Sequence, residues 1–270
     1  MLPNINLFGK TITWYTIAVL TGIFVVLIFQ QIYTKKIGHD EVFMLYILLF
    51  GSIGAFAGGH ILYAITMYKQ LISFISNPEN FSNFKTIINN LASIFGGSVF
   101  YGGLLGGIFS AYLYMRKKKL DLDPYIGIGA LCIPLFHGFG RIGCFLSGCC
   151  YGIESTFGID LKYSPVPGCS GVLRFPVQLI ESGCNFIIFF LLLFLFNKKI
   201  ISGRKTLISY LMLYSIIRFV LEFFRGDWYR GFIGPLSTSQ IISIAVFVVC
   251  LIALLFNIQK KKNKSISVEN

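Results

Sequence analysis

Residues 177–197 read VQLIESGCNFIIFFLLLFLFN, and this stretch decides the class of fold. Its second half consists almost entirely of Phe, Leu and Ile, and Lys198 and Lys199 follow it directly. A helix of about 20 apolar residues is long enough to cross the hydrocarbon core of a bilayer. The stretch therefore predicts a transmembrane helix that ends at basic residues.

The same pattern recurs along the chain. The 270 residues have a mean hydropathy of +0.74 and only 13% charged residues, whereas a soluble domain carries about 25%. Hydropathy predicts spans at residues 12–33, 42–68, 94–115, 125–148, 177–197, 206–225 and 236–257. We find no internal repeat and no domain boundary. The expectation is an all-α polytopic membrane protein of about seven transmembrane helices, with one domain covering residues 1–270.

The basic residues between the spans predict the orientation. Alternate connections hold 14 Lys and Arg on one side and 7 on the other, and the richer side includes Lys198, Lys199 and the C-terminal lysines. Cytoplasmic loops carry the excess of Lys and Arg. We therefore expect the N-terminus outside, the C-terminus in the cytoplasm, and extracytoplasmic segments at about 69–93 and 149–176. This clustering accounts for most of the net charge of +12 and argues against a nucleic-acid partner.

Two arginines, Arg141 and Arg218, fall within or near predicted spans. An arginine inside a bilayer costs about 3 kcal/mol on insertion scales, so it usually has a function or a partner. Arg141 lies in the sequence HGFGRIGCFLSGCCYG, residues 137–152, in which Gly140 and Gly143 leave room beside its side chain. A buried guanidinium suits a phosphodiester because its donors can bind two oxygens at once.

The second arginine begins the sequence RFVLEFFRGD, residues 218–227. Arg218 and Glu222 are four residues apart, and Glu222 and Arg225 three apart, so a helix would place them in one polar stripe with Asp227 just beyond. The stripe is either a structural set of ion pairs or one side of a site that faces Arg141.

Further polar positions are consistent with packing or interface anchoring when taken singly. They are Tyr15 in the first span, the glycine-rich stretch around Tyr101, and Gln178 and Glu181 at the start of the fifth span. The seven cysteines are an odd number without paired CxxC and histidine spacing, so no disulfide framework, metal or cofactor is predicted. A disulfide between Cys169 and either Cys149 or Cys150 is a separate expectation for an oxidising exterior.

Taken in order, these motifs resemble the prolipoprotein diacylglyceryl transferase family. The resemblance runs from Trp14 to Gln240 and is carried by GRIGCF at 140–145, PVQLIE at 176–181 and RFVLEFFR at 218–225. It implies a seven-helix enzyme of the bacterial cytoplasmic membrane, expected to act as a monomer. The implied reaction transfers the diacylglyceryl group of phosphatidylglycerol to the lipobox cysteine at the signal peptide of a preprolipoprotein. A thioether forms and glycerol-1-phosphate leaves.

The resemblance assigns Arg141 and Arg218 to the lipid phosphate and Glu222 to the paired carboxylate. The chain departs from the family pattern where Tyr101 replaces a histidine, and where Cys144 and Cys149 replace an asparagine and a glutamate. His137 is therefore the candidate base, and His60 is the competing candidate. Tyr101 occupies the position at which the family usually has its histidine.

Three other functions stay open at this point. The arginines could hold an anionic lipid without catalysis, as in a lipid binder or transporter. The chain could be a paralogue with another thiol acceptor, or a redox or metal protein using Cys144, Cys149 and Cys150.

Overall fold

The computed structural model describes residues 5–7, 10–81, 83–97, 100–162, 164, 166, 169–227 and 232–269. The chain packs as two compact units, residues 1–33 with 123–270 and residues 34–122. The prediction of one domain over 1–270 is not decided by this division and stays a prediction.

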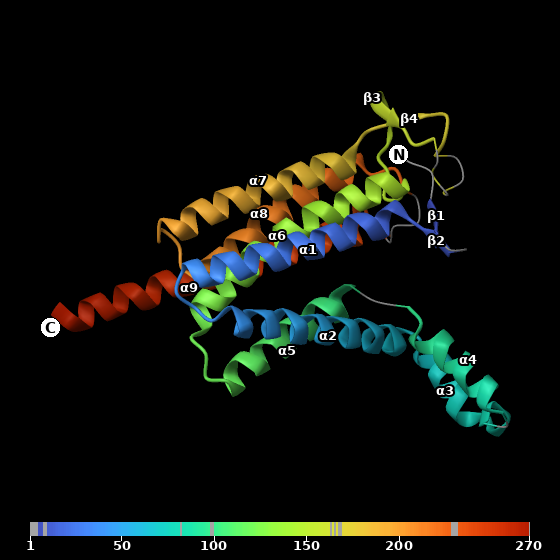
Figure 1. Ribbon diagram of the computed structural model, residues 1–270, viewed down its shortest axis with the longest axis horizontal. Helices are drawn as coiled ribbons and strands as arrows, with labels where there is room; N and C mark the ends of the chain where they lie inside the picture. Colours follow the sequence, from blue (N-terminus) through green and yellow to red (C-terminus); the bar gives the residue numbers. More distant parts are fainter. Residues whose placement is uncertain are drawn as a thin grey trace. The chain divides into compact units, whose positions relative to one another are not determined.

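The first unit is a bundle of long helices that run side by side (Figure 1). Its helices are α1 (Trp14–Lys36, whose last turn passes into the second unit), α6 (Leu122–Ser147), α7 (Val177–Asn197), α8 (Gly203–Leu221) and α9 (Thr238–Glu269). A short 3-10 turn, η2 (Glu222–Phe224), extends α8.

Local sequence explains how α8 and α9 begin. Ser202 is the N-cap of α8, and the Asp123 carboxylate of α6 accepts from the backbone N–H of Gly203 at 2.8 Å and of Arg204 at 3.1 Å. A Cβ at Gly203 would lie 1.7 Å from the Asp123 carbonyl oxygen, so only glycine fits there. At α9, the Ser237 hydroxyl accepts from Gln240 N and the Gln240 amide oxygen from Ser237 N, a capping box.

Short strands lie at one end of this bundle. The antiparallel pairs are β1 (Ile5–Leu7) with β2 (Lys10–Ile12), β3 (Glu154–Asp160) with β4 (Leu173–Arg174), and β5 (Phe232–Ile233) with β6 (Leu236–Ser237). An isolated bridge joins Gly152 to Arg225. The predicted outer segment 149–176 therefore contains a small hairpin that is tied to the end of α8.

The second unit contains α2 (Glu41–Thr66), α3 (Tyr68–Ser76), η1 (Pro78–Phe81), α4 (Phe84–Phe95) and α5 (Phe100–Lys117). Glycines let α2 and α5 approach closely: a Cβ at Gly58 would lie 2.2 Å from Gly102 O, and one at Gly106 would lie 2.3 Å from Gly54 O. This is small-residue helix packing of the kind common in membranes.

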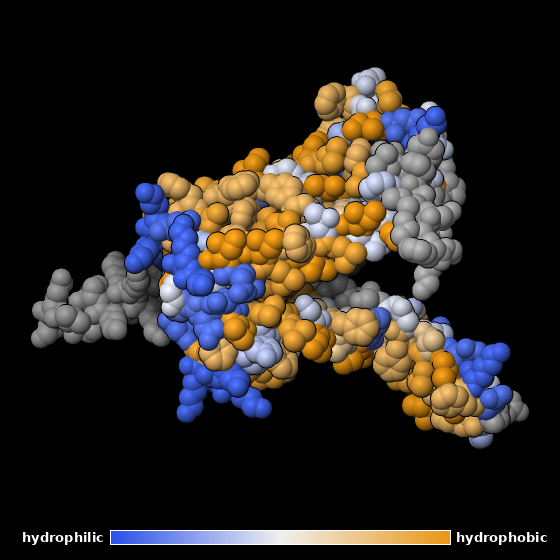
Figure 2. All heavy atoms as spheres, in the orientation of Figure 1, coloured by the Kyte–Doolittle hydropathy of each residue, from blue (hydrophilic) through white to orange (hydrophobic). Residues whose placement is uncertain are grey.

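Six helices of the described chain are long and apolar enough to cross a membrane. They are Trp14–Lys36, Glu41–Ile65, Leu122–Ser147, Val177–Asn197, Gly203–Phe224 and Thr238–Phe256. Apolar side chains cover the length of the bundle and polar ones gather at its ends (Figure 2). The remaining predicted span, residues 94–115, was placed wrongly at its start, because α4 ends at Phe95 and α5 begins at Phe100. Whether α5 is a seventh span stays a prediction.

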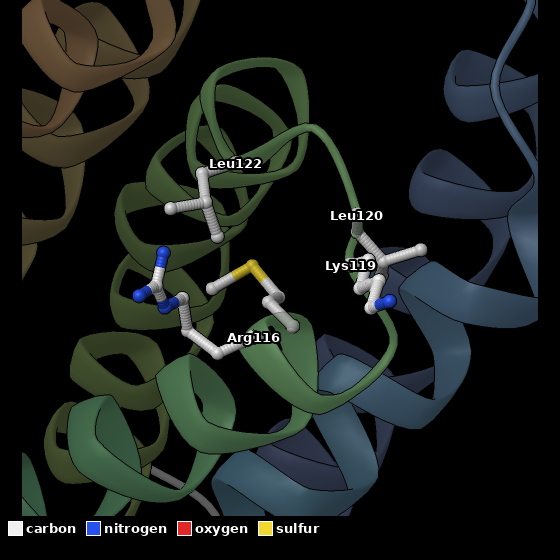
Figure 3. Close-up of a pocket in the computed structure, with 5 residues that line it drawn as sticks. Arg116, Lys119, Leu120 and Leu122 are labelled. Carbon is white, nitrogen blue, oxygen red and sulfur yellow. The ribbon is translucent and has the colours of Figure 1, made fainter.

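The second unit also has a pocket beside the turn that ends α5. Figure 3 shows Arg116, Lys119, Leu120 and Leu122 around it, and Met115 completes the lining. None of the predicted site residues lines this pocket. Arg116 and Lys119 belong to the basic cluster that the charge count assigns to the cytoplasm.

Candidate functional site

Glu181, in the first turns of α7, is the centre of the site. Its side chain is 1% exposed, and four side chains from α6 and α8 approach its carboxylate. Arg141 Nη2 lies 3.0 Å from Oε1, and Tyr214 donates its hydroxyl to the same oxygen at 2.8 Å. Arg218 Nη1 lies 3.8 Å from Oε2, and His137 Nε2 lies 3.8 Å from Oε1. A buried carboxylate with such partners is strongly held in place.

The two predicted arginines therefore converge on one carboxylate from different helices. Arg141 projects from α6 and Arg218 from α8, and their side chains are 15% and 14% exposed. Arg218 also binds Glu222 Oε2 at 2.7 Å and donates to Ser239 Oγ of α9 at 3.1 Å. The expected i, i+4 pair of Arg218 and Glu222 is confirmed, and Arg218 shares the Glu181 carboxylate with Arg141.

Both guanidinium groups retain donors for a further acceptor. Arg141 Nε and Arg218 Nη1 are buried nitrogens that make no hydrogen bond to the part of the chain that the structure describes. Buried N–H groups in proteins are nearly always paired. Two unsatisfied donors on converging cations suit an anion with several oxygens, such as a phosphodiester.

The polar stripe on α8 is longer than the stripe predicted from the sequence. Tyr210, Tyr214, Arg218 and Glu222 follow one another at four-residue intervals, which places them on one face. Tyr210 and Tyr214 stack with ring centroids 5.9 Å apart. The regular spacing of these tyrosines ahead of Arg218 was the signal that could have identified them.

His137 lies against this tyrosine pair. Its Nδ1 is 3.3 Å from the Tyr210 hydroxyl, and its Nε2 is 3.5 Å from the Tyr214 hydroxyl. The side chain is 25% exposed, more than either arginine. The imidazole thus belongs to the Glu181 network and keeps some accessible surface.

Two supporting residues contact the segment that follows α6, Gln178 through its side chain and Arg225 through its backbone bridge to Gly152. Gln178 donates to the carbonyl oxygen of Cys149 at 2.8 Å, which joins the start of α7 to that loop. Arg225 forms a bidentate pair with Asp227 through its Nε and Nη2. The expected stripe from Glu222 to Arg225 is wrong in this detail, because α8 ends at Leu221 and Arg225 has extended backbone. Asp227, two residues on, is therefore its partner.

The glycines beside Arg141 differ in what they make room for. A Cβ at Gly143 would lie 3.0 Å from the Tyr15 ring, so this glycine permits the packing of α1 on α6. A Cβ at Gly140 would meet no described atom within 4 Å. Gly140 therefore faces open space rather than a neighbouring helix.

Three thiols lie next to Arg141. Arg141 Nη1 points to Cys144 Sγ at 4.0 Å, and the sulfurs of Cys144, Cys149 and Cys150 all lie within 4.8 Å of one another. Outside the span, hydrogen bonds from the Cys144 and Cys149 thiols lower the pKa of Cys150, and Arg225 and Arg141 lower it further.

The other predicted positions lie elsewhere or outside the described side chains. Tyr101 is in α5 of the second unit, and its side chain is not among those described. His60 is in α2 of the same unit, where its Nδ1 lies 2.6 Å from Phe95 O. Cys169 is a free, fully buried thiol packed with Tyr151 and Leu161, so the expected disulfide is not formed in this structure.

Comparison with known proteins covers both units. A sequence profile described as prolipoprotein diacylglyceryl transferase matches residues 4–256. The phosphatidylglycerol–prolipoprotein diacylglyceryl transferase of Clostridium tetani is 35% identical over 256 residues, which are 94% of this chain and 96% of that protein. The Clostridium perfringens protein bearing this name with the number 2 is 34% identical over 96% of this chain and 95% of its own length. The Campylobacter lari enzyme is 28% identical over 96% and 94%. With the profile match spanning nearly all its length, this chain belongs to the prolipoprotein diacylglyceryl transferase family.

Proposed function

We propose that this protein transfers the diacylglyceryl group of phosphatidylglycerol to the lipobox cysteine thiol of a preprolipoprotein. The relatives are named for phosphatidylglycerol and prolipoprotein as substrates, at 27–35% identity and with nearly full coverage. The observation that carries the proposal is the convergence of Arg141 and Arg218 inside a bundle of apolar helices. Each guanidinium keeps a buried N–H donor that has no described acceptor.

The arginines bind the phosphodiester of the lipid headgroup. Two guanidinium groups from different helices offer donors in two planes, so one phosphate can be held from two sides. Gly140, next to Arg141 in the sequence, adds no side chain to the open surface there. In the low-dielectric interior these charge-assisted hydrogen bonds are stronger than they would be in water.

The same cations stabilise the leaving group. The acceptor sulfur attacks the glyceryl carbon, a C–S bond forms, and the C–O bond to the phosphate breaks. The electron pair of that bond goes to the phosphate oxygen of glycerol-1-phosphate, and the thiol proton goes to a base or to water. Fixed cations aimed at the oxygen on which charge develops lower the barrier.

Glu181 and Glu222 orient the two arginines. Glu181 contacts Arg141 and Arg218, and Glu222 contacts Arg218. Without these carboxylates two buried cations would repel each other. We assign both glutamates as positioning residues, and His137 as the candidate base that takes the acceptor's proton.

We further propose a place and an orientation for the enzyme. It acts as a monomer in the bacterial cytoplasmic membrane, with the N-terminus outside and the basic C-terminal residues in the cytoplasm. The segments 69–93 and 149–176 then lie on the outer side, where a preprolipoprotein presents its lipobox after export.

The test is the release of glycerol phosphate from phosphatidylglycerol vesicles by the purified protein. A lipobox peptide should support release and gain the mass of a diacylglyceryl group, whereas the same peptide with serine for cysteine should do neither. Lipid binding without release, in the presence of the cysteine peptide, would instead indicate a binder or transporter. Restoration of lipoprotein maturation in cells depleted of their own transferase tests the same proposal in vivo.

A further inference from the structure

The end of α6 and the loop that follows it bring together three thiols that the proposed transfer does not use. Cys144 lies in the last turns of α6, and Cys149 and Cys150 follow it. All three are partly buried, and their sulfurs lie within 4.8 Å of one another. The remaining cysteines provide no comparable group among the described residues.

The backbone around these thiols is fixed by contacts from several elements. Cys149 donates its N–H to Cys144 O at 3.1 Å, and its carbonyl oxygen accepts from Gln178 of α7. Cys150 has a φ of 54°, in the left-handed region, which costs a residue other than glycine about 1–2 kcal/mol. The bridge between Gly152 and Arg225 holds the chain just beyond it. A strained residue that the surroundings hold in place is often part of a functional site.

A cation lies beside the three thiols, with Arg141 Nη1 4.0 Å from Cys144 Sγ. Thiolates, rather than thiols, are the metal ligands, so metal binding here would release the thiol protons.

We propose that Cys144, Cys149 and Cys150 bind one thiophilic metal ion of the Zn²⁺ class through three sulfurs. With Zn–S bonds of about 2.3 Å, tetrahedral coordination needs sulfurs about 3.8 Å apart, so the present spacing closes by about 1 Å or less. Three protein ligands leave the fourth position for water or for a ligand of the site. The ion would lie beside Arg141, at the edge of the proposed phosphate site.

A metal uses this group more fully than a disulfide would. A disulfide brings two sulfurs to about 2.05 Å and leaves the third without a role. Three sulfurs within 4.8 Å of one another match the donor set of a closed-shell, thiolate-preferring cation.

The test uses the full chain in detergent, purified with a tag that does not chelate metals and kept reduced. Cd²⁺ is the probe, because Cd–thiolate bonds absorb in the ultraviolet and Zn²⁺ competes for the same ligands. We expect one equivalent of Cd²⁺ per chain in the wild type and in Cys184→Ser, a matched cysteine on α7. Cys149→Ser and Cys144→Ser should lose stoichiometric binding. The proposal is overturned if the wild-type protein shows no Cd–thiolate absorption under reducing conditions. It is also overturned if the Cys149→Ser variant keeps that absorption.

A second measurement needs no variant and so does not depend on how the variants fold. Zn²⁺ should slow maleimide alkylation of Cys144, Cys149 and Cys150 in the native protein and leave Cys184 unaffected, as read by mass spectrometry of peptides. Equal alkylation with and without Zn²⁺ counts against the site. Neither measurement depends on transfer activity, so a failure here is separate from a failure of the proposed function.

Discussion

Arg141 binds through geometry as well as charge. Its guanidinium reaches Glu181 and still carries a buried donor at Nε. Lysine keeps the charge but has a compact ammonium that cannot make a planar, two-point contact. Arg141→Lys should therefore lower kcat/KM for phosphatidylglycerol by about 10²-fold or more. Arg116→Lys, outside the site, should leave it unchanged; wild-type turnover in Arg141→Lys would contradict the assignment.

His137 is the residue whose assignment as base most needs a kinetic test. A general base must be unprotonated, so activity falls on the acidic side of its titration, and its removal costs about 10²-fold or more. His137→Gln should show this loss and no acidic limb in the pH profile of kcat/KM. Tyr101→Phe and His60→Gln should retain the limb. An unchanged profile in His137→Gln would leave the imidazole with a structural role between Tyr210 and Tyr214.

Single residues differ in how far the sequence reveals them. Arg141 and Arg218 were identifiable because a charge within an apolar run is costly and so seldom incidental. Glu181 was identified only as a supporting residue, since it lies near the start of its apolar run, where a carboxylate can also face water. Its central position depends on contacts from two other helices, and no local pattern in residues 176–181 contains that information.

At the scale of elements, the contact between α2 and α5 depends on particular glycines. A Cβ at Gly58 would lie 2.2 Å from a backbone oxygen of α5, whereas one at Gly51 of the same helix would lie 3.7 Å from its nearest neighbours. Gly58→Ala should therefore lower the apparent Tm in detergent, because overpacking costs about 1–3 kcal/mol. Gly51→Ala should match the wild type or exceed it slightly, since alanine favours helix by about 1 kcal/mol. Equal melting of both variants would argue against this close packing.

The boundaries of the elements show where hydropathy stops being informative. Most predicted spans agree with helices of the bundle to within a few residues, because an uninterrupted apolar run has one plausible structure in lipid. Residues 84–97 are different: α4 is an amphipathic helix, and its apolar face with Ile94 packs against Ala64 and Phe74. Its apolar residues were merged with those of α5 in the predicted span, since a hydropathy average does not separate one apolar face from a fully apolar helix.

For the whole molecule, the testable prediction is its orientation. The count of Lys and Arg places the β3–β4 hairpin outside and the connection between α7 and α8 in the cytoplasm. In intact spheroplasts, Glu154→Cys should gain labelling by a membrane-impermeant maleimide over the unsubstituted protein. Lys198→Cys should gain labelling only after the membrane is opened. Both positions are exposed, so the opposite pattern would reverse the proposed topology.

The pairing of both arginines with Glu181 has a consequence for how tightly the enzyme holds its lipid. The guanidinium groups already face a carboxylate, so an arriving phosphodiester binds through their remaining donors to cations whose charge Glu181 partly neutralises. The attraction is weaker than that of two uncompensated cations, and we expect modest affinity for the headgroup. Modest affinity suits turnover, because the glycerol phosphate formed by the transfer can then leave. When no lipid is bound, the Glu181 carboxylate also partly neutralises the two arginines, so the membrane interior does not hold two uncompensated charges.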